Sequence, residues 1–165
     1  MAWDTIRNTV AAEFSDLGSA AEVTQLMVRL LVAAFLGGLL GLEREMQGKP
    51  AGIRTHMLVA ASSALIVFVT LKVGFEGDAL SRVLQGLLSG IGFLCAGAIL
   101  KLEREEQVTG LTTAASVWMT SAIGIAAGLG REMTAALATL LVLFILWLET
   151  PLKRLGLKER DDREG

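Results

Sequence analysis

The stretch VTQLMVRLLVAAFLGGLLGL, residues 23–42, decides the fold class, because Arg29 is the one charged residue among its 20. About 20 mostly apolar residues, at a rise of 1.5 Å each, cover the roughly 30 Å of hydrocarbon in a bilayer. Backbone amides find no water there, so they must be satisfied inside the segment as a helix. The stretch therefore predicts a membrane-spanning helix.

Four further apolar stretches follow, so that five spans are expected: Val23–Leu42, Thr55–Val73, Val83–Leu100, Val108–Leu129 and Met133–Leu148. The chain of 165 residues is 53% hydrophobic and 19% charged, with a mean hydropathy of +0.57. This composition is typical of a membrane protein and excludes a disordered chain or a disulfide scaffold. Short links make neighbouring helices antiparallel. We predict an all-α polytopic membrane protein, a compact bundle of about five transmembrane helices.

Residues 1–22 predict an N-terminal amphipathic helix, because apolar residues from Trp3 to Leu17 recur at three- and four-residue steps. Such a helix either lies on the membrane surface or packs over the outer mouth of the bundle. We divide the chain into this segment (1–22), a transmembrane domain (23–152) and a charged cytoplasmic tail (153–165). The tail is either an anchor to anionic lipid or a solvated end with no further role.

Lysine and arginine fall unevenly on the two sides of the predicted bundle. With the N-terminus outside, the inner side carries ten of them and the outer side four. Short positively charged loops stay in the cytoplasm, so we expect the N-terminus outside and the C-terminus in the cytoplasm. The inner set is Arg44, Lys49, Arg54, Lys101, Arg104, Lys153, Arg154, Lys158, Arg160 and Arg163, and the outer set is Arg7, Lys72, Arg82 and Arg131.

Arg29 lies inside the first span, about 9 Å from Val23 along the helix. A charge at this depth is costly unless it is paired. Two interpretations stay open. The side chain either extends outward to the lipid headgroups, or it faces the interior and pairs with helix-end carbonyls or with an acid, for which Asp78 and Glu132 are the candidates.

Polar and charged residues gather at the inner ends of the spans, and we take them as the candidate functional and partner-binding residues. Ordinary ion pairing and helix-start packing are the alternatives. Carboxylate oxygens of Glu43 and Glu45, with water, can also hold Mg²⁺, so these two are the candidate metal ligands. The full candidate set is Arg29, Glu43, Arg44, Arg54, Thr55, His56, Thr112, Thr113 and Trp118.

Glycines recur at four-residue steps in three of the predicted spans, which allows helices to approach closely. The pairs are Gly37 with Gly41, Gly86 with Gly90, and Gly124 with Gly128. Three such pairs exceed what one bundle obviously needs, so we expect a homo-oligomer.

Other function classes are disfavoured by the sequence. No nucleophile and base are arranged together, and Cys95 lies among apolar residues that keep a thiol inert. No phosphate-binding glycine loop is present. The net charge of −2 gives no excess of positive charge for nucleic acid. We therefore expect neither an enzyme nor a nucleic-acid-binding protein.

Three ordered blocks in the chain resemble the MgtC/SapB family of bacterial inner-membrane proteins, over about residues 29–130. They are RLL (29–31) leading to GLERE (41–45), PAGIRTH (50–56), and GIGFL (90–94) with GLTTAA (110–115) and Trp118. The chain departs from the family pattern in two ways. Cys95 stands where the family commonly has glycine. We also expect a short form, without the soluble C-terminal domain of the virulence-associated members.

The resemblance implies a multi-pass protein of the bacterial inner membrane, linked to growth in low magnesium and to virulence. It also implies, for the virulence-associated members, the F-type ATP synthase as a partner. Our expectation is a non-enzymatic protein that modulates a membrane partner or magnesium-linked ion homeostasis through its inner-face cluster. The alternative is a transporter or channel for Mg²⁺ or another cation.

Overall fold

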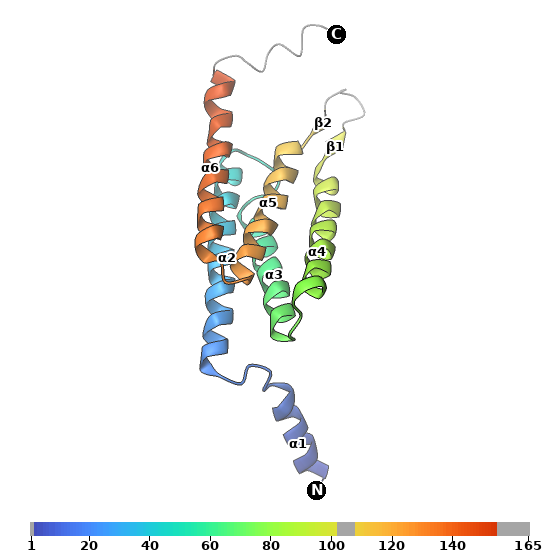
Figure 1. The fold of residues 1–165 in the computed structure, drawn as a ribbon. Coiled ribbons are helices and arrows are strands. Elements are labelled where there is room, and N and C mark those ends of the chain that lie inside the picture. The colour runs from blue at the N-terminus through green and yellow to red at the C-terminus, as the bar shows by residue number, and fades with distance from the viewer. Residues whose placement is uncertain (1, 102–107, 155–165) are drawn as a thin grey trace.

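The computed structural model describes residues 2–101 and 108–154, and most of them are helical (Figure 1). The prediction of an all-α membrane bundle is confirmed. The helices are α1 (Ala2–Glu13), α2 (Ala20–Met46), α3 (Ile53–Lys72), α4 (Gly77–Ala98), α5 (Leu111–Gly128) and α6 (Glu132–Arg154). Two short antiparallel strands, β1 (Leu100–Lys101) and β2 (Val108–Thr109), join α4 to α5. The sequence analysis did not predict this strand pair.

Helices α2, α3, α4 and α5 are each long and apolar enough to cross a membrane. The fifth predicted span falls in α6, whose apolar stretch Glu132–Leu148 is shorter than each of these four helices. Consecutive helices run in opposite directions, so the ends of α2, α4 and α6 lie at the same end of the bundle as the starts of α3 and α5 (Figure 1). We call this the Arg44 end and the opposite end the Arg29 end.

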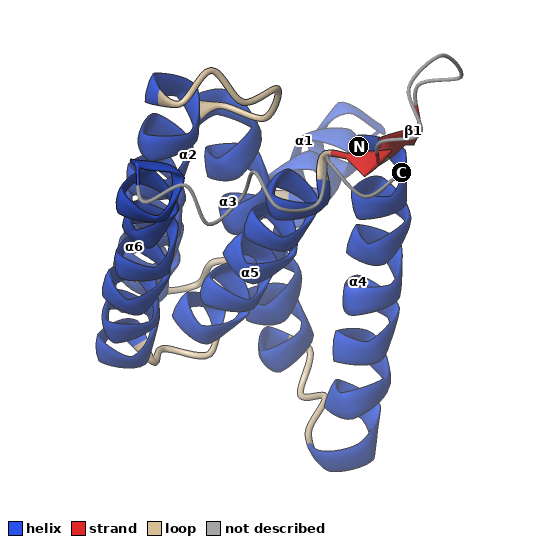
Figure 2. Ribbon diagram, turned by 90° about the horizontal axis from the view of Figure 1, so that it is seen from above, coloured by secondary structure: helices blue, strands red, loops and turns tan. Residues whose placement is uncertain are grey.

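Helix α5 is the centre of the bundle, since it packs against α2, α3, α4 and α6 (Figure 2). The main apolar core lies between α2, α3, α5 and α6 and includes Ala33, Leu40, Ala60, Ile123 and Ala127. Small side chains dominate because the helix backbones are close. Large apolar side chains such as Phe35, Leu58 and Leu140 point outward instead, as lipid contact requires.

The glycines of α2 and α5 explain this close packing. A Cβ atom at Gly41 would lie 2.5 Å from Ile53 Cα, and one at Gly37 would lie 2.6 Å from the His56 carbonyl oxygen. On the other side of α3, Gly124 and Gly128 lie against the backbones of Ala60 and Ala64 in the same way. Four glycines therefore let α3 fit between α2 and α5.

Local signals fix where two helices start. Ser19 caps α2, because its side-chain oxygen accepts a hydrogen bond from the Glu22 backbone N–H at 3.2 Å. Gly110 precedes α5 with φ of +89°, and a Cβ there would collide with the Ala98 carbonyl oxygen. Glycine is the residue that tolerates both conditions. At the Arg29 end, an ion pair between Lys72 and Glu22 joins α3 to α2.

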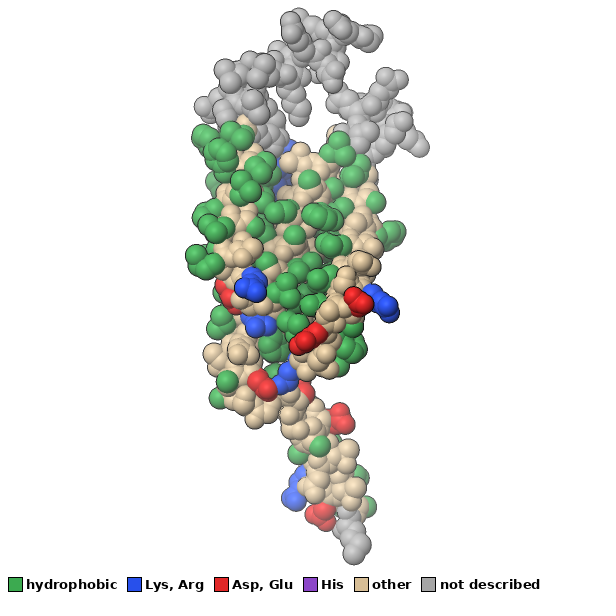
Figure 3. Space-filling view, viewed as in Figure 1, with side chains coloured by type: hydrophobic (Ala, Val, Ile, Leu, Met, Phe, Trp, Pro, Cys, Tyr) green, Lys and Arg blue, Asp and Glu red, His purple; other side chains and the backbone are tan. Residues whose placement is uncertain are grey.

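Helix α1 extends away from the bundle (Figure 1) and has no buried residue. Its apolar side chains Trp3, Ile6, Val10 and Phe14 are all exposed. The structure therefore disfavours packing over the mouth of the bundle, and the surface-lying helix stays our prediction. On the face drawn in Figure 3, charged side chains gather on α1 and at the Arg29 end, while apolar ones cover the helices from there toward the Arg44 end.

Candidate functional site

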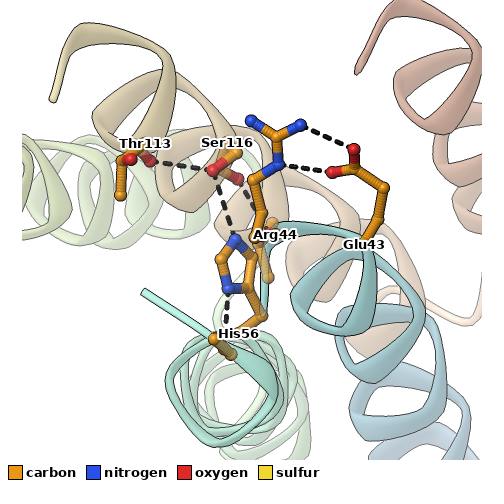
Figure 4. Close-up of polar contacts among 7 residues, drawn as sticks. Glu43, Arg44, His56, Thr113 and Ser116 are labelled. Atoms are coloured by element: carbon orange, nitrogen blue, oxygen red, sulfur yellow. Dashed lines mark hydrogen bonds and ion pairs between the residues drawn. The ribbon is translucent and has the colours of Figure 1, made fainter. Parts of the chain in front are cut away.

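A buried ion pair lies at the Arg44 end of α2. Arg44 is fully buried, and its Nη2 donates to Glu43 Oε1 at 2.7 Å while its Nε donates to Glu43 Oε2 (Figure 4). The side chain of Glu43 is 19% exposed. A two-point contact of this kind is the strong geometry for arginine and carboxylate. The pair therefore places the Arg44 guanidinium inside the protein, with the partly exposed Glu43 carboxylate at its surface.

His56 connects α3 to α5 at the same end. Its Nε2 lies 3.2 Å from Ser116 Oγ, and its Nδ1 lies 3.0 Å from the Gly52 carbonyl oxygen, which fixes the ring orientation. The Ser116 hydroxyl donates to the Thr113 carbonyl oxygen at 2.8 Å. Figure 4 shows His56 and Ser116 next to the side chain of Arg44. We call Glu43, Arg44, His56, Thr113 and Ser116 the Arg44 cluster.

Buried hydroxyls continue this polar contact between α3 and α5 toward the middle of the bundle. Ser63 Oγ and Ser121 Oγ are 2.9 Å apart, and the fully buried Thr120 donates to the Ser116 carbonyl oxygen at 2.8 Å. Each polar group is satisfied without water. The helices α3 and α5 are therefore held together by hydrogen bonds as well as by close glycine packing.

The structure divides the predicted cluster into a buried part and an exposed part. Glu43, Arg44, His56 and Thr113 come together at the Arg44 end, but Arg54, Thr55, Thr112 and Trp118 are exposed. Trp118 and Thr112 line a cavity of about 460 Å³ between α5 and α6. The acids at 103, 105 and 106 lie outside the described residues, as does the tail from residue 155.

The two candidate metal ligands have other contacts. Glu43 binds Arg44, and Glu45 Oε2 accepts a hydrogen bond from the Ile53 backbone N–H at 3.0 Å. Glu45 thus caps α3, whose own N-cap residue Gly52 has no side chain. Within residues 2–101 and 108–154, no three His, Cys, Asp or Glu side chains gather as metal ligands. The Mg²⁺ site at Glu43 and Glu45 stays a prediction.

Arg29 lies at the far end of α2 and binds the end of α5. Its Nη1 donates to the Gly128 carbonyl oxygen at 2.8 Å, and its guanidinium carbon lies 5.5 Å from the centre of the Phe68 ring. Positive charge is stabilised at a helix C-terminus and over an aromatic ring. The helix-end carbonyl interpretation is correct. The acid partners are not found, since neither Asp78 nor Glu132 pairs with Arg29 among the described residues.

Arg29 is far from the Arg44 cluster and belongs to a separate structural contact. The sequence analysis also missed Ser116, Ser63 and Ser121 as partners. The available signal was a row of hydroxyls at four-residue steps, which points to a polar helix contact in a membrane.

The apolar antiparallel helices and the polar contacts inside them define a multi-pass membrane protein. The chain belongs to the MgtC family, whose model matches residues 30–155. The predicted family resemblance is thereby confirmed.

Several curated proteins are similar to the chain. It is 42% identical to protein SrpB of Synechococcus elongatus over 134 aligned residues. This alignment covers 73% of this chain and 72% of SrpB. It is 39% identical over 131 residues to the putative magnesium transporter YhiD of Escherichia coli, covering 74% of this chain and 59% of YhiD. It is 39% identical over 117 residues to protein MgtC of Salmonella typhimurium, covering 71% of this chain and 49% of MgtC. No solved structure matches the chain.

Proposed function

We propose that this protein modulates a partner protein in the membrane, and through it magnesium-linked ion homeostasis, from its Arg44 end. The magnesium link is supported by the family and by the printed name of YhiD, although the chain spans 59% of YhiD and 49% of MgtC. The proposal takes the Arg44 end as the cytoplasmic end, in the bacterial inner membrane, because of the uneven placement of lysine and arginine.

One observation carries the proposal: a buried contact, with His56 Nε2 3.2 Å from Ser116 Oγ, holds the start of α3 against the first two turns of α5. The exposed residues at those turns, Arg54 and Thr112, are therefore presented on a rigid support. A cation and a hydroxyl on preorganised helix starts suit recognition of a protein surface, because little side-chain or backbone ordering is lost on binding. The buried Arg44 pair supports this surface and does not itself contact the partner.

Arg54→Ala tests the proposal. Since Arg54 is exposed, the variant should insert and accumulate as the wild type does, yet fail to support growth in low magnesium in cells that lack their own copy. Arg131→Ala, which removes an exposed arginine at the Arg29 end, is the matched control and should grow normally. Membrane abundance of each variant is measured beside growth. Wild-type growth of Arg54→Ala would contradict the proposal.

Partner identity stays a prediction, including the F-type ATP synthase implied by the resemblance. Mild detergent extraction of wild type and Arg54→Ala, followed by mass spectrometry, identifies proteins that depend on this residue. If this protein is a modulator, one membrane protein should co-purify with the wild type and should be absent from the Arg54→Ala preparation.

Cation transport is the second candidate, and the printed name of YhiD favours it. The described helices argue against it, because they bring no three potential metal ligands together. We expect liposomes that contain only this protein to show no Mg²⁺ uptake above protein-free liposomes, measured with an enclosed fluorescent Mg²⁺ indicator. Uptake above that background would replace the modulator proposal with transport.

A further inference from the structure

His56 is the single histidine of the chain and is fully buried at the start of α3. Both of its ring nitrogens have partners, since Nδ1 lies 3.0 Å from the Gly52 carbonyl oxygen and Nε2 lies 3.2 Å from Ser116 Oγ. Ser116 Oγ in turn lies 2.8 Å from the Thr113 carbonyl oxygen (Figure 4). Three polar contacts therefore follow one another from the start of α3 into α5.

The hydrogens available to these three contacts can be counted. Each contact joins two atoms that carry lone pairs, so each contact needs one hydrogen between its atoms. A neutral imidazole supplies one ring hydrogen and the Ser116 hydroxyl supplies one, which leaves one contact without a hydrogen. An imidazolium supplies two ring hydrogens, and every contact then has its own. The arrangement around His56 therefore has a place for one additional proton.

The neutral ring can meet this shortage in one way that keeps α3 and α5 in contact. A carbonyl oxygen cannot donate, so the ring hydrogen belongs on Nδ1, which faces Gly52. Nε2 then accepts the Ser116 hydroxyl hydrogen, and the Thr113 carbonyl loses it. When a proton binds at Nε2, the ring donates to Ser116 instead, and the hydroxyl hydrogen returns to Thr113. Proton binding thus reverses the direction of the hydrogen bond between α3 and α5.

The surroundings of the ring act on this proton in opposite directions. Figure 4 shows the buried side chain of Arg44 beside the ring, and repulsion opposes a second positive charge there. The Gly52 carbonyl and the Ser116 hydroxyl favour the imidazolium, because hydrogen bonds from a charged donor are roughly twice as strong as neutral ones. These opposed effects keep the proton exchangeable. The described elements packed against this end of α3 carry these titratable groups: Glu43, Arg44 and Glu45 on α2, Lys49 in the link to α3, and Cys95 on α4, with none on α5.

We infer that His56 is a reversible proton-binding site, and that the bound proton strengthens the contact between α3 and α5 at the Arg44 end. The proton comes from water at this end of the bundle. The same contact supports the exposed residues Arg54 and Thr112. The consequence for partner binding therefore rests on the proposed function: the partner should bind more tightly in acid, because the charge-assisted bond holds the two helix starts more firmly.

Nitrogen NMR of the imidazole ring tests the proton site without any variant. The full chain is labelled with nitrogen-15 histidine, purified without a histidine tag and reconstituted in lipid bilayers, so every ring signal comes from His56. Between about pH 9 and about pH 5, the ring should change from a neutral form with its hydrogen on Nδ1 to the imidazolium. A ring that keeps one protonation state over this range would overturn the inference.

Ser116→Ala tests whether the hydroxyl belongs to the proton site. The imidazolium loses a charge-assisted bond in this variant, whereas the neutral ring loses an ordinary one, so the midpoint of the NMR titration should fall by about half a pH unit or more. Thr120→Ala is the matched control, because it removes a buried hydroxyl of α5 that donates to the Ser116 carbonyl oxygen. Its midpoint should equal that of the wild type. An equal midpoint in Ser116→Ala and the wild type would also overturn the inference.

The effect on partner binding is measured separately, by mild detergent extraction at about pH 6 and about pH 8. The wild type should retain at least about twice as much partner at the lower pH, and Ser116→Ala should lose this difference. Equal recovery of a partner from the wild type at both pH values would overturn the regulatory step. Absence of any partner at both pH values would instead contradict the proposed function, while the NMR titration still decides on the proton site.

Discussion

Replacing Arg44 by leucine is expected to lower the free energy of unfolding by about 3–5 kcal/mol, which makes it one of the two most damaging changes we anticipate. Arg44 is fully buried, and its Nη2 lies 2.7 Å from Glu43 Oε1. Without the arginine, the Glu43 carboxylate loses its cation in a place where water reaches it poorly. Because 19% of the Glu43 side chain is exposed, we expect a loss near the lower limit.

The measurement is urea unfolding of purified protein in detergent micelles, followed by tryptophan fluorescence. Arg54→Leu is the control, since it removes an exposed arginine at the same end of the bundle and should change stability by less than about 0.5 kcal/mol. The double variant Glu43→Leu/Arg44→Leu should recover much of the loss, because replacing both members of a buried pair with apolar groups removes the uncompensated charge. Equal stability of Arg44→Leu and wild type would show that the pair contributes little.

Much of the fold could be predicted from the sequence, because the bilayer sets the length of an apolar helix. The first predicted span started at Val23, and α2 starts at Ala20, where Ser19 caps it. The strand pair between α4 and α5 could not be predicted. Its strands have two residues each, and so short a segment has no recognisable alternation of polar and apolar residues.

The candidate site was predicted only in part, since partners far apart in sequence leave no local pattern. His56 and Ser116 are 60 positions apart, and Arg29 binds a backbone carbonyl 99 positions away. A backbone acceptor is present at every residue and gives no sequence signal. Composition also could not separate buried Arg44 from exposed Arg54, because that difference depends on the direction of each side chain from its helix.

The glycine pairs show the same limit. Gly124 with Gly128 and Gly86 with Gly90 have the same spacing in the sequence, yet the first pair lies against α3 and the second faces open space. The spacing predicts that a helix can approach closely. It does not identify which helix does so, or whether that helix belongs to the same chain.

Gly124→Val is the other change with a large expected effect, a loss of about 3 kcal/mol in the free energy of unfolding. A Cβ atom at this position would collide with the Ala60 carbonyl oxygen and would lie 2.9 Å from Ala60 Cα. These are backbone atoms of α3, so they cannot rotate away as a side chain would. The helices α3 and α5 must separate, and the Ser63–Ser121 hydrogen bond of 2.9 Å must lengthen with them.

The matched control for this change is Gly97→Val on α4, where an added Cβ meets nothing within 4 Å. Both variants make the same substitution, so the difference in their unfolding midpoints in detergent isolates the effect of helix contact from that of valine itself. We expect Gly97→Val to unfold within about 0.5 kcal/mol of the wild type. If Gly124→Val were as stable as Gly97→Val, α3 and α5 would have to lie farther apart than described, and the His56–Ser116 contact would lose its geometric basis.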